Sequence, residues 1–476
     1  MATTNGTPNR NANDHNEVPV TKILANFVAN ASTSQLTAAL REKVKEVVID
    51  YIGVVVGAID NADSTEPIYN AILTLQGQGT KGNCTVIAKG APHMLPQYAA
   101  LLNSAFGHSL DFDDTHAPGT LHAGVTSISA AMTQAEILSD KASSDEFMLA
   151  VSVAYEVTCR IGRELGFFSY DRGFHNTSIA GIFGAVAAIA VLKKLPARVI
   201  EDAFGLACSK AAGSMQYLDN GSWNKRMHPG FAVHDAFMCV ALAEAGVVGA
   251  TRIIEGKMGF LQAYSPNPSP DLQRLVSGLG EEWIWQGSSL KPYPACRMTH
   301  GFIELCGKIC DDHGGKVTAA DVKAITLSTS PSCFKLVGDP TPNKIHPENV
   351  IDGQFSAYFQ AANALVYGSA TGMKAYQRLQ DKDVNALCDK ITVDRDSSMS
   401  SFQARMQVEW ADGKVEDFRQ DFPLGEVEHP FTRDKVDEKF SSLAAPVYGK
   451  GKAADIIKTI DGLEGKSVEE LLVLLR

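Results

Sequence analysis

The sequence lacks CxxC pairs, an excess of basic residues and long apolar runs. Its nine cysteines are scattered over 476 residues, which is typical of reduced thiols and argues against a disulfide framework or a cysteine-ligated zinc or iron–sulfur site. Acidic residues outnumber basic ones 54 to 43, for a net charge of −11. Such a balance predicts no binding to nucleic acids or anionic membranes. The longest apolar run, residues 179–192, is short for a membrane span and typical of a buried helix.

Motifs for nucleotides and for common metal sites are also missing. We find no P-loop and no HExxH, and neither GxGxxG nor GxSxG between a strand and a helix. A catalytic Ser-His-Asp triad remains an alternative, although no motif identifies its nucleophilic serine. The sequence therefore predicts no nucleotide cofactor, while a metal site stays open at this point.

The N-terminal residues 1–18 are rich in Asn and Thr and almost free of large apolar groups. We expect a disordered tail. It has neither the apolar region of a signal peptide nor the basic amphipathic pattern of a mitochondrial transit peptide. The prediction is a cytoplasmic protein, with a mitochondrial location as the less favoured alternative.

Hydrophobic periodicity divides the remaining chain into three parts. Residues 19–285 repeat with a helical period, and Ser143 and Glu146 form a capping box before one long helix. Residues 286–425 mix helices with an alternating strand pattern at 324–330 and a hairpin turning at Asp412-Gly413. The helical period returns over 426–476. The sequence thus predicts a mainly α protein, in which a large all-helical domain is interrupted by a smaller α+β domain.

The stretch His108–Gly124, "HSLDFDDTHAPGTLHAG", carries three aspartates and three histidines between two apolar helical segments. Three interpretations are open: helix capping in a solvated turn, a metal site, or general acid/base catalysis. The stretch lacks the glycine of an EF-hand loop. Loops on rigid scaffolds often carry function.

Three further stretches hold candidate groups. His175 precedes a predicted helix with Thr177 or Ser178 as its N-cap, and helix N-termini attract carboxylates. Lys225, Arg226 and His228 are expected in a loop bounded by Gly and Pro. Lys291, Arg297 and His300 fall at the predicted domain junction, where ligand pockets are common. Each stretch could equally be an ordinary cap, solvated loop or linker, but together they offer cations for a polycarboxylate and imidazoles for proton transfer.

The sequence resembles the MmgE/PrpD family, which includes 2-methylcitrate dehydratase, cis-aconitate decarboxylase and iminodisuccinate epimerase. The motifs are "LDFDDTH", "LHAG", "FHNTS", "NKRMHPGFA" and "SLKPYPACRMTH". The resemblance covers residues from about 20 to about 470. It implies a helical domain with a smaller α+β lid, a homodimer, no metal, and an active site between the two domains.

Matched motif by motif, the resemblance implies the catalytic residues Asp111, His122, His175, Lys225 and Lys291. Thr115 and an aromatic near Phe334 are implied as substrate contacts, to which the basic stretches add Arg226, His228 and Arg297. Cis-aconitate decarboxylases resemble one another in having Tyr where Phe334 stands, and this difference favours another reaction. The Asn/Thr-rich leader suggests a fungal homologue, and fungal relatives include alkylcitrate dehydratases of secondary metabolism.

We therefore predict a lyase that dehydrates a 2-alkylcitrate, a small tricarboxylate. Lys225 and Lys291 would stabilise the developing enediolate charge, while His122 and His175 divide the roles of base and acid. Asp111 would orient an imidazole or act as the base. The alternatives are cis-aconitate decarboxylation, epimerisation of a dicarboxylate such as iminodisuccinate, a non-catalytic polycarboxylate-binding subunit, and a metal-dependent hydrolase.

Overall fold

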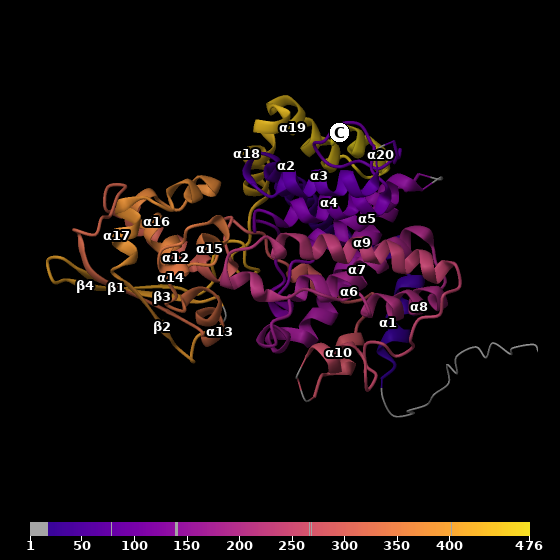
Figure 1. The fold of residues 1–476 in the computed structure, drawn as a ribbon, viewed down its shortest axis with the longest axis horizontal. Helices are drawn as coiled ribbons and strands as arrows, with labels where there is room; N and C mark the ends of the chain where they lie inside the picture. Colours follow the sequence, from indigo (N-terminus) through magenta and orange to yellow (C-terminus); the bar gives the residue numbers. More distant parts are fainter. Residues whose placement is uncertain (1–17, 78, 139–140, 266, 268, 401) are drawn as a thin grey trace, which may run out of the picture.

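A computed structural model describes residues 18–77, 79–138, 141–265, 267, 269–400 and 402–476. The predicted tail, apart from Val18, lies outside the described residues. The chain is mainly helical and carries one small sheet (Figure 1). Its buried apolar side chains form two clusters, one in a helical bundle and one in a smaller α+β unit.

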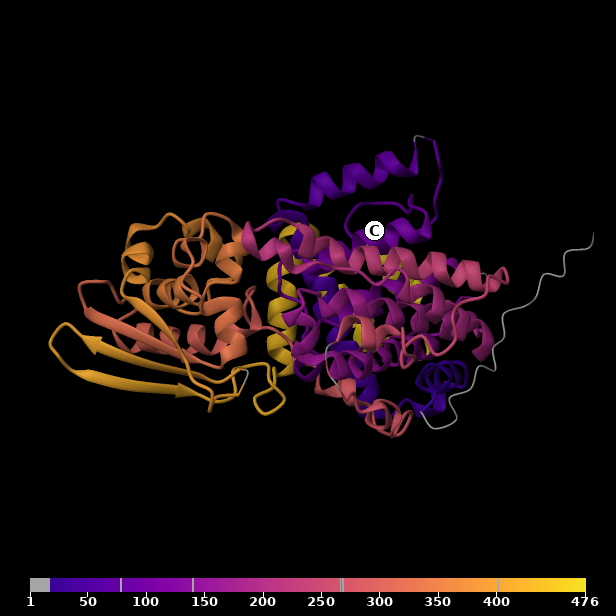
Figure 2. The same ribbon diagram turned by 60° about the horizontal axis from the view of Figure 1, so that its bottom comes forward.

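The helical bundle is built from helices at both ends of the described chain. Its first part comprises α1 (Val20–Ala29), α2 (Ala38–Asn61), α3 (Thr65–Gln76), α4 (Pro96–His108), α5 (Gly124–Ile137), α6 (Ser144–Asp171), α7 (Asn176–Lys193), α8 (Ala197–Cys208), α9 (Asn224–Glu244), α10 (Phe260–Tyr264) and α11 (Leu272–Val276). Its last part comprises α18 (Arg433–Tyr448), α19 (Lys450–Asp461) and α20 (Val468–Leu474). Helix α18 packs on α2 and α20 packs on α5, so the last helices share the core of the first ones (Figure 2).

Local sequence signals account for several of these helices. The capping box at the start of α6 is confirmed: Ser143 Oγ accepts from Glu146 N at 3.2 Å, and Glu146 Oε2 accepts from Ser143 N at 3.0 Å. Helix α7 is apolar on all sides because it packs against α5, α6, α8 and α9. It is long and apolar enough to cross a membrane by composition, yet 89% of it is buried inside the bundle.

The smaller unit holds a four-stranded sheet in the order β2-β1-β3-β4. Strands β1 (Val322–Thr329) and β2 (Ile391–Arg395) are parallel, whereas β3 (Ala404–Trp410) is antiparallel to both β1 and β4 (Val415–Gln420). The predicted hairpin is confirmed, and Gly413 supplies the left-handed residue of its turn with φ +89°. The helical segments of this unit are α12 (His300–Asp312), α13 (Pro331–Cys333), α14 (Pro342–Ile345), α15 (Val350–Gln354), α16 (Ala357–Tyr367) and α17 (Lys382–Cys388).

Two local predictions were wrong. The N-cap of α7 is His175, because the hydroxyl of Thr177 instead accepts the backbone N–H of His122 at 3.1 Å. The stretch with Lys225 and His228 is the first part of helix α9 and not a loop, since the helix accommodates Pro229 in its interior.

Candidate active site

A cavity of about 60 Å³ lies where the helical bundle meets the smaller unit. Junctions between domains are common places for small-molecule sites. The bundle and the linker that follows it contribute Asp111, Thr115, His116, Ala117, Thr120, Leu121, His122, Tyr170, Tyr217, Lys225, Lys291, Cys296, Arg297 and Met298. The smaller unit contributes Leu336, Phe355 and Phe402. We call Asp111, Lys225 and Lys291 the charged side of the cavity, and Leu336, Phe355 and Phe402 its apolar wall. The two adjoin, since Lys225 Nζ lies 5.7 Å from the centroid of the Phe355 ring.

The loop after α4 carries two carboxylates, Asp111 and Asp113, that contact different partners. Asp111 faces lysines, whereas Asp113 faces imidazoles. Asp111 adopts a left-handed backbone with φ +50°, which costs about 1 kcal/mol in a residue with a Cβ. Strain of this kind persists where surrounding contacts fix the backbone, and it clusters at functional sites.

Asp111 joins the ammonium groups of Lys225 and Lys291. Its Oδ1 lies 2.9 Å from Lys225 Nζ and 2.7 Å from Lys291 Nζ, and Lys291 also donates to the Asp111 carbonyl at 3.0 Å. Burial by itself would raise the pKa of Asp111, but the two ammonium groups hold that pKa well below its ordinary range. Two ammonium groups facing one carboxylate leave a local excess of positive charge around Asp111, which favours an anionic ligand there.

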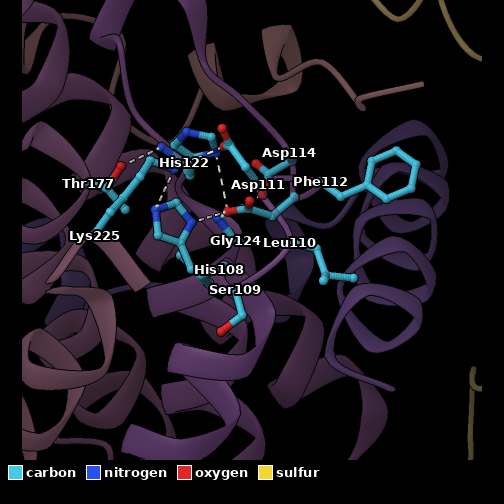
Figure 3. A network of polar contacts seen from close by, with 12 residues as sticks. His108, Ser109, Leu110, Asp111, Phe112, Asp114, His122, Gly124, Thr177 and Lys225 are labelled. Carbon is cyan, nitrogen blue, oxygen red and sulfur yellow. Dashed lines mark hydrogen bonds and ion pairs between the residues drawn. The ribbon is translucent and has the colours of Figure 1, made fainter. Parts of the chain in front are cut away.

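Asp113 joins the imidazoles of His108 and His122. Its Oδ2 lies 2.8 Å from His108 Nδ1 and 3.2 Å from His122 Nδ1. The rings of His108 and His122 lie beside each other (Figure 3), with centroids 4.7 Å apart. Lys225 Nζ lies 3.2 Å from His108 Nε2. Because an ammonium only donates, His108 Nε2 is the acceptor and Nδ1 carries the proton. Burial lowers the pKa of His108 to about 3, so this imidazole is neutral at physiological pH.

His122 lines the cavity and is the imidazole best placed for proton transfer. Its Nδ1 faces the Asp113 carboxylate, which favours the tautomer with the proton on Nδ1 and a basic lone pair on Nε2. Burial lowers the pKa of His122, and the charges of Lys291 and Lys225 lower it further, while Asp113 opposes them. The neutral form is the form that can accept a proton.

Three helix N-termini meet at this cluster. His122 stands two residues before α5, His175 is the N-cap of α7, and Lys225 is the second residue of α9. The three helices pack against one another. Helix N-termini carry partial positive charge from unpaired backbone N–H groups. They add to the positive potential of the two lysines and favour a carboxylate ligand.

His175 and His228 form a second layer behind the cavity. Both are buried, and His175 Nδ1 lies 3.1 Å from His228 Nδ1. The His175 ring stacks on His108 with centroids 5.5 Å apart. The structure therefore brings His175 into the cluster, but neither of these imidazoles is among the residues that line the cavity. Burial lowers the pKa of His228 to about 4.

Two of the expected substrate contacts line the cavity. Thr115 is held by paired backbone hydrogen bonds with Ser289, of 2.8 and 2.7 Å. Arg297 is tied to the chain that returns to the bundle: its Nε donates to Glu426 Oε1 at 2.6 Å, and its Nη1 donates to the Leu424 carbonyl at 3.0 Å. Because Glu426 neutralises Arg297, most of the free positive charge comes from the lysines.

The structure does not bring Arg226 and Phe334 to the cavity. Arg226 Nη1 donates to Asp63 at 2.5 Å and to Ser64 at 2.8 Å, because its place on α9 directs it toward α3. Phe334 packs under the guanidinium of Arg395, 4.6 Å from the ring centroid. Two residues later the same segment presents Leu336 to the cavity. Phe334, where cis-aconitate decarboxylases are expected to have Tyr, therefore lies outside the residues that line the cavity.

Several site residues were missed from the sequence. His108 and Asp113 stand in the same stretch as Asp111, and a short-range His–Asp pair was the available signal. No local pattern points to the aromatic and apolar lining residues Tyr170, Tyr217, Phe355, Leu336 and Phe402. They come from separate segments, so only the fold places them together.

His108, Asp113 and His122 also form the donor set closest to a metal site in the described part of the chain. Their ligand atoms lie within 4.8 Å of one another, and two imidazoles with a carboxylate suit several transition metals. However, His108 Nε2 already accepts from Lys225, and the same carboxylate oxygen faces both Nδ1 atoms. Nearby ammonium groups oppose a cation. The donor set fits proton transfer better than metal binding.

The geometry brings two ammonium groups, two carboxylates and neutral imidazoles together at and behind one cavity, a set suited to an anionic ligand and to proton transfer. Sequence comparison gives the family. The MmgE/PrpD N-terminal domain matches residues 22–273, and the MmgE/PrpD C-terminal domain matches residues 293–464. The chain belongs to the MmgE/PrpD family.

Relatives of known name match over nearly their whole length. A cis-aconitate decarboxylase-like protein, oryM, of Aspergillus oryzae is 27% identical over 100% of this chain and 99% of its own. A cis-aconitate decarboxylase of Aspergillus terreus is 25% identical over 96% of both chains. The cis-aconitate decarboxylase of Mus musculus is 24% identical over 96% of this chain and 93% of its own.

Proposed function

We propose that this protein is a lyase that removes water from a 2-alkylcitrate by general acid/base catalysis without a cofactor. The observation that carries the proposal is the meeting of Lys225 and Lys291 at one oxygen of Asp111, beside His122, in a cavity with an apolar wall. The two ammonium groups support a polycarboxylate as the ligand, and the wall favours an alkyl substituent.

Elimination of water breaks a C–H bond next to a carboxylate and a C–O bond at the neighbouring carbon. Lys225 and Lys291 stabilise the enediolate-like charge as the proton leaves, an effect that is largest in a water-poor site. His122 takes the proton. The departing hydroxyl receives a proton and leaves as water. His175, expected from the sequence to share the proton transfers with His122, lies behind the cavity. In this proposal the second proton therefore comes from a cavity-lining ammonium group, Lys225 or Lys291.

The apolar wall supports an alkyl-bearing substrate. Leu336, Phe355 and Phe402 line the cavity together with Met298. Citrate carries no alkyl substituent to pack against such a wall, whereas each further methylene buried from water contributes about 0.8 kcal/mol. In this proposal the smaller unit is a lid inserted into the helical domain, and it selects the chain of the substrate.

Decarboxylation of cis-aconitate is the second candidate, favoured by the names of the relatives. Loss of CO2 leaves a carbanion that needs the same cations and a proton donor, so the charged side serves either reaction. Epimerisation of a dicarboxylate needs proton removal and return on opposite faces. A non-catalytic binding subunit needs the cations alone.

A substrate panel separates these functions. The protein is incubated with 2-methylcitrate, longer 2-alkylcitrates, cis-aconitate and iminodisuccinate, and products are identified by mass spectrometry after chiral chromatography, which resolves epimers of equal mass. Lys291→Met is the inactive control. We expect loss of water from alkylcitrates. Loss of CO2 from cis-aconitate with no dehydration would establish the second candidate instead, and binding without any product would establish the binding subunit.

Three further properties belong to this proposal. We propose a homodimer, for which α9 offers an exposed apolar stripe of Phe231, Met238 and Leu242. We also propose a cytoplasmic location and a role in fungal secondary metabolism. Sedimentation analysis, with charged substitutions on the stripe, tests the first of these.

A further inference from the structure

Helix α18, far along the chain from the active-site loop, places a buried lysine beneath that loop. Lys439 Nζ lies 2.6 Å from Asp50 Oδ1 on α2 and donates to the Phe112 carbonyl at 2.6 Å. The same ammonium lies 3.9 Å from the centroid of the Phe112 ring. Lys439 and Asp50 are both buried, and neither lines the cavity.

Phe112 separates the two carboxylates that organise the site. Asp111 precedes it and holds both lysines, and Asp113 follows it and holds both imidazoles. A rotation of the peptide between them would turn both carboxylates away from their partners.

Each carbonyl around this turn is held by a different part of the chain. Gln354 Nε2 of the smaller unit donates to the Leu110 carbonyl at 2.7 Å, and Lys291 donates to the Asp111 carbonyl at 3.0 Å. Lys439 holds the next one, at Phe112. Since Asp111 has a strained left-handed backbone, such contacts are what keeps the turn in place.

We propose that Lys439 is a positioning residue of the active site. Its ammonium, neutralised by Asp50, fixes the Phe112 carbonyl and thereby the directions of Asp111 and Asp113. The effect on turnover rests on the proposed function, whereas the effect on the loop does not. Small displacements of reacting groups lower rates by as much as about 100-fold, so the loss is expected in kcat and not in ligand binding.

The test compares Asp50→Asn with the double variant Asp50→Asn/Lys439→Met. Asp50→Asn keeps the donor to Phe112 but leaves the Lys439 ammonium without its carboxylate, whereas the double variant removes both charges together with the donor. Lys45→Met is the matched control: Lys45 is a buried lysine on the same α2, pairs with Glu464 near the C-terminus at 2.8 Å, and has no contact with the loop. The readouts are kcat and KM on 2-methylcitrate, the stoichiometry and Kd of citrate binding by calorimetry, and amide hydrogen exchange of residues 109–116.

We expect the double variant to turn over about 10- to 100-fold more slowly than Asp50→Asn, with one citrate site per chain, an unchanged Kd and faster exchange in the loop. Lys45→Met should match the wild type in all three. A purely structural role would lower the binding stoichiometry together with kcat. Equal kcat and equal loop exchange in the two Asp50 variants would overturn the proposal. If the wild type dehydrates no tricarboxylate, the proposed function fails, while the exchange measurement still decides the role of Lys439.

Discussion

Asp114 should make the protein less stable as the pH rises, and Asp114→Asn should remove that dependence. The Asp114 carboxyl is buried, and its Oδ1 accepts the backbone N–H of Gly124 at 3.1 Å. A Cβ at Gly124 would collide with this oxygen and with the hydroxyl of Tyr155, so the glycine permits the close packing around the carboxyl. Burial, with the charges of Asp113 and Asp50, raises the pKa of Asp114 to about 8.

The sign and size of the effect follow from this pKa. An ordinary aspartate titrates near 3.8, so between these values the folded chain keeps a proton that the unfolded chain releases. The free energy of unfolding therefore falls as the pH rises. One pKa unit corresponds to about 1.4 kcal/mol, so raising the pH from about 5 to about 7 lowers stability by up to about 3 kcal/mol through this one group.

Urea unfolding at several pH values measures this effect, followed by circular dichroism and by tryptophan fluorescence. Trp285 is a suitable probe because its ring centroid lies 4.7 Å from that of Tyr155. Histidines with lowered pKa, such as His108 and His116, act in the opposite direction, so the informative quantity is the difference between wild type and Asp114→Asn. That difference should shift in favour of the variant from about pH 5 to about pH 7. Parallel curves would refute the assignment of a protonated Asp114.

Four further predictions concern the site itself. Lys225→Met and Lys291→Met should each lower kcat/KM on the true substrate by about 100- to 1,000-fold while thermal unfolding stays cooperative; near wild-type kinetics in both would exclude the charged side as the active site. Asp113→Asn should lower kcat by about 100-fold or more, because the imidazoles lose the acceptor that sets their tautomer, and an unchanged pH–rate profile would contradict this. Leu336→Phe should reduce turnover of long alkylcitrates relative to 2-methylcitrate, whereas Phe334→Leu should not; the reverse result would favour the position inferred from sequence. Activity should survive dialysis against EDTA, and elemental analysis should find no stoichiometric metal. Loss of activity that an added metal restores would instead support metal binding at His108, Asp113 and His122.

Much of the local structure could be predicted because its signals are short-range. The capping box at Ser143 and the turn at Gly413 each involve a few neighbouring residues. The motifs around Asp111, His122, Lys225 and Lys291 identified most of the polar site, since their residue types limit the chemistry. The predictions failed where long-range contacts set the direction of a side chain. The Thr177 hydroxyl accepts the backbone N–H of His122, and His175 is the N-cap of α7. Arg226 donates to Asp63 and not to the cavity.

Residue types and their order indicate the class of chemistry, since lysines, imidazoles and carboxylates occur in family-specific motifs. Helical periodicity indicates the mainly α fold. Tertiary packing sets which of these side chains contact one another at the cavity. Packing places His122 at the cavity and His175 behind it. Leu336 lines the cavity and Phe334 does not, and Lys439 lies beneath Phe112. The physical reason is that residue type fixes what a group can do, whereas its direction depends on packing between segments hundreds of residues apart.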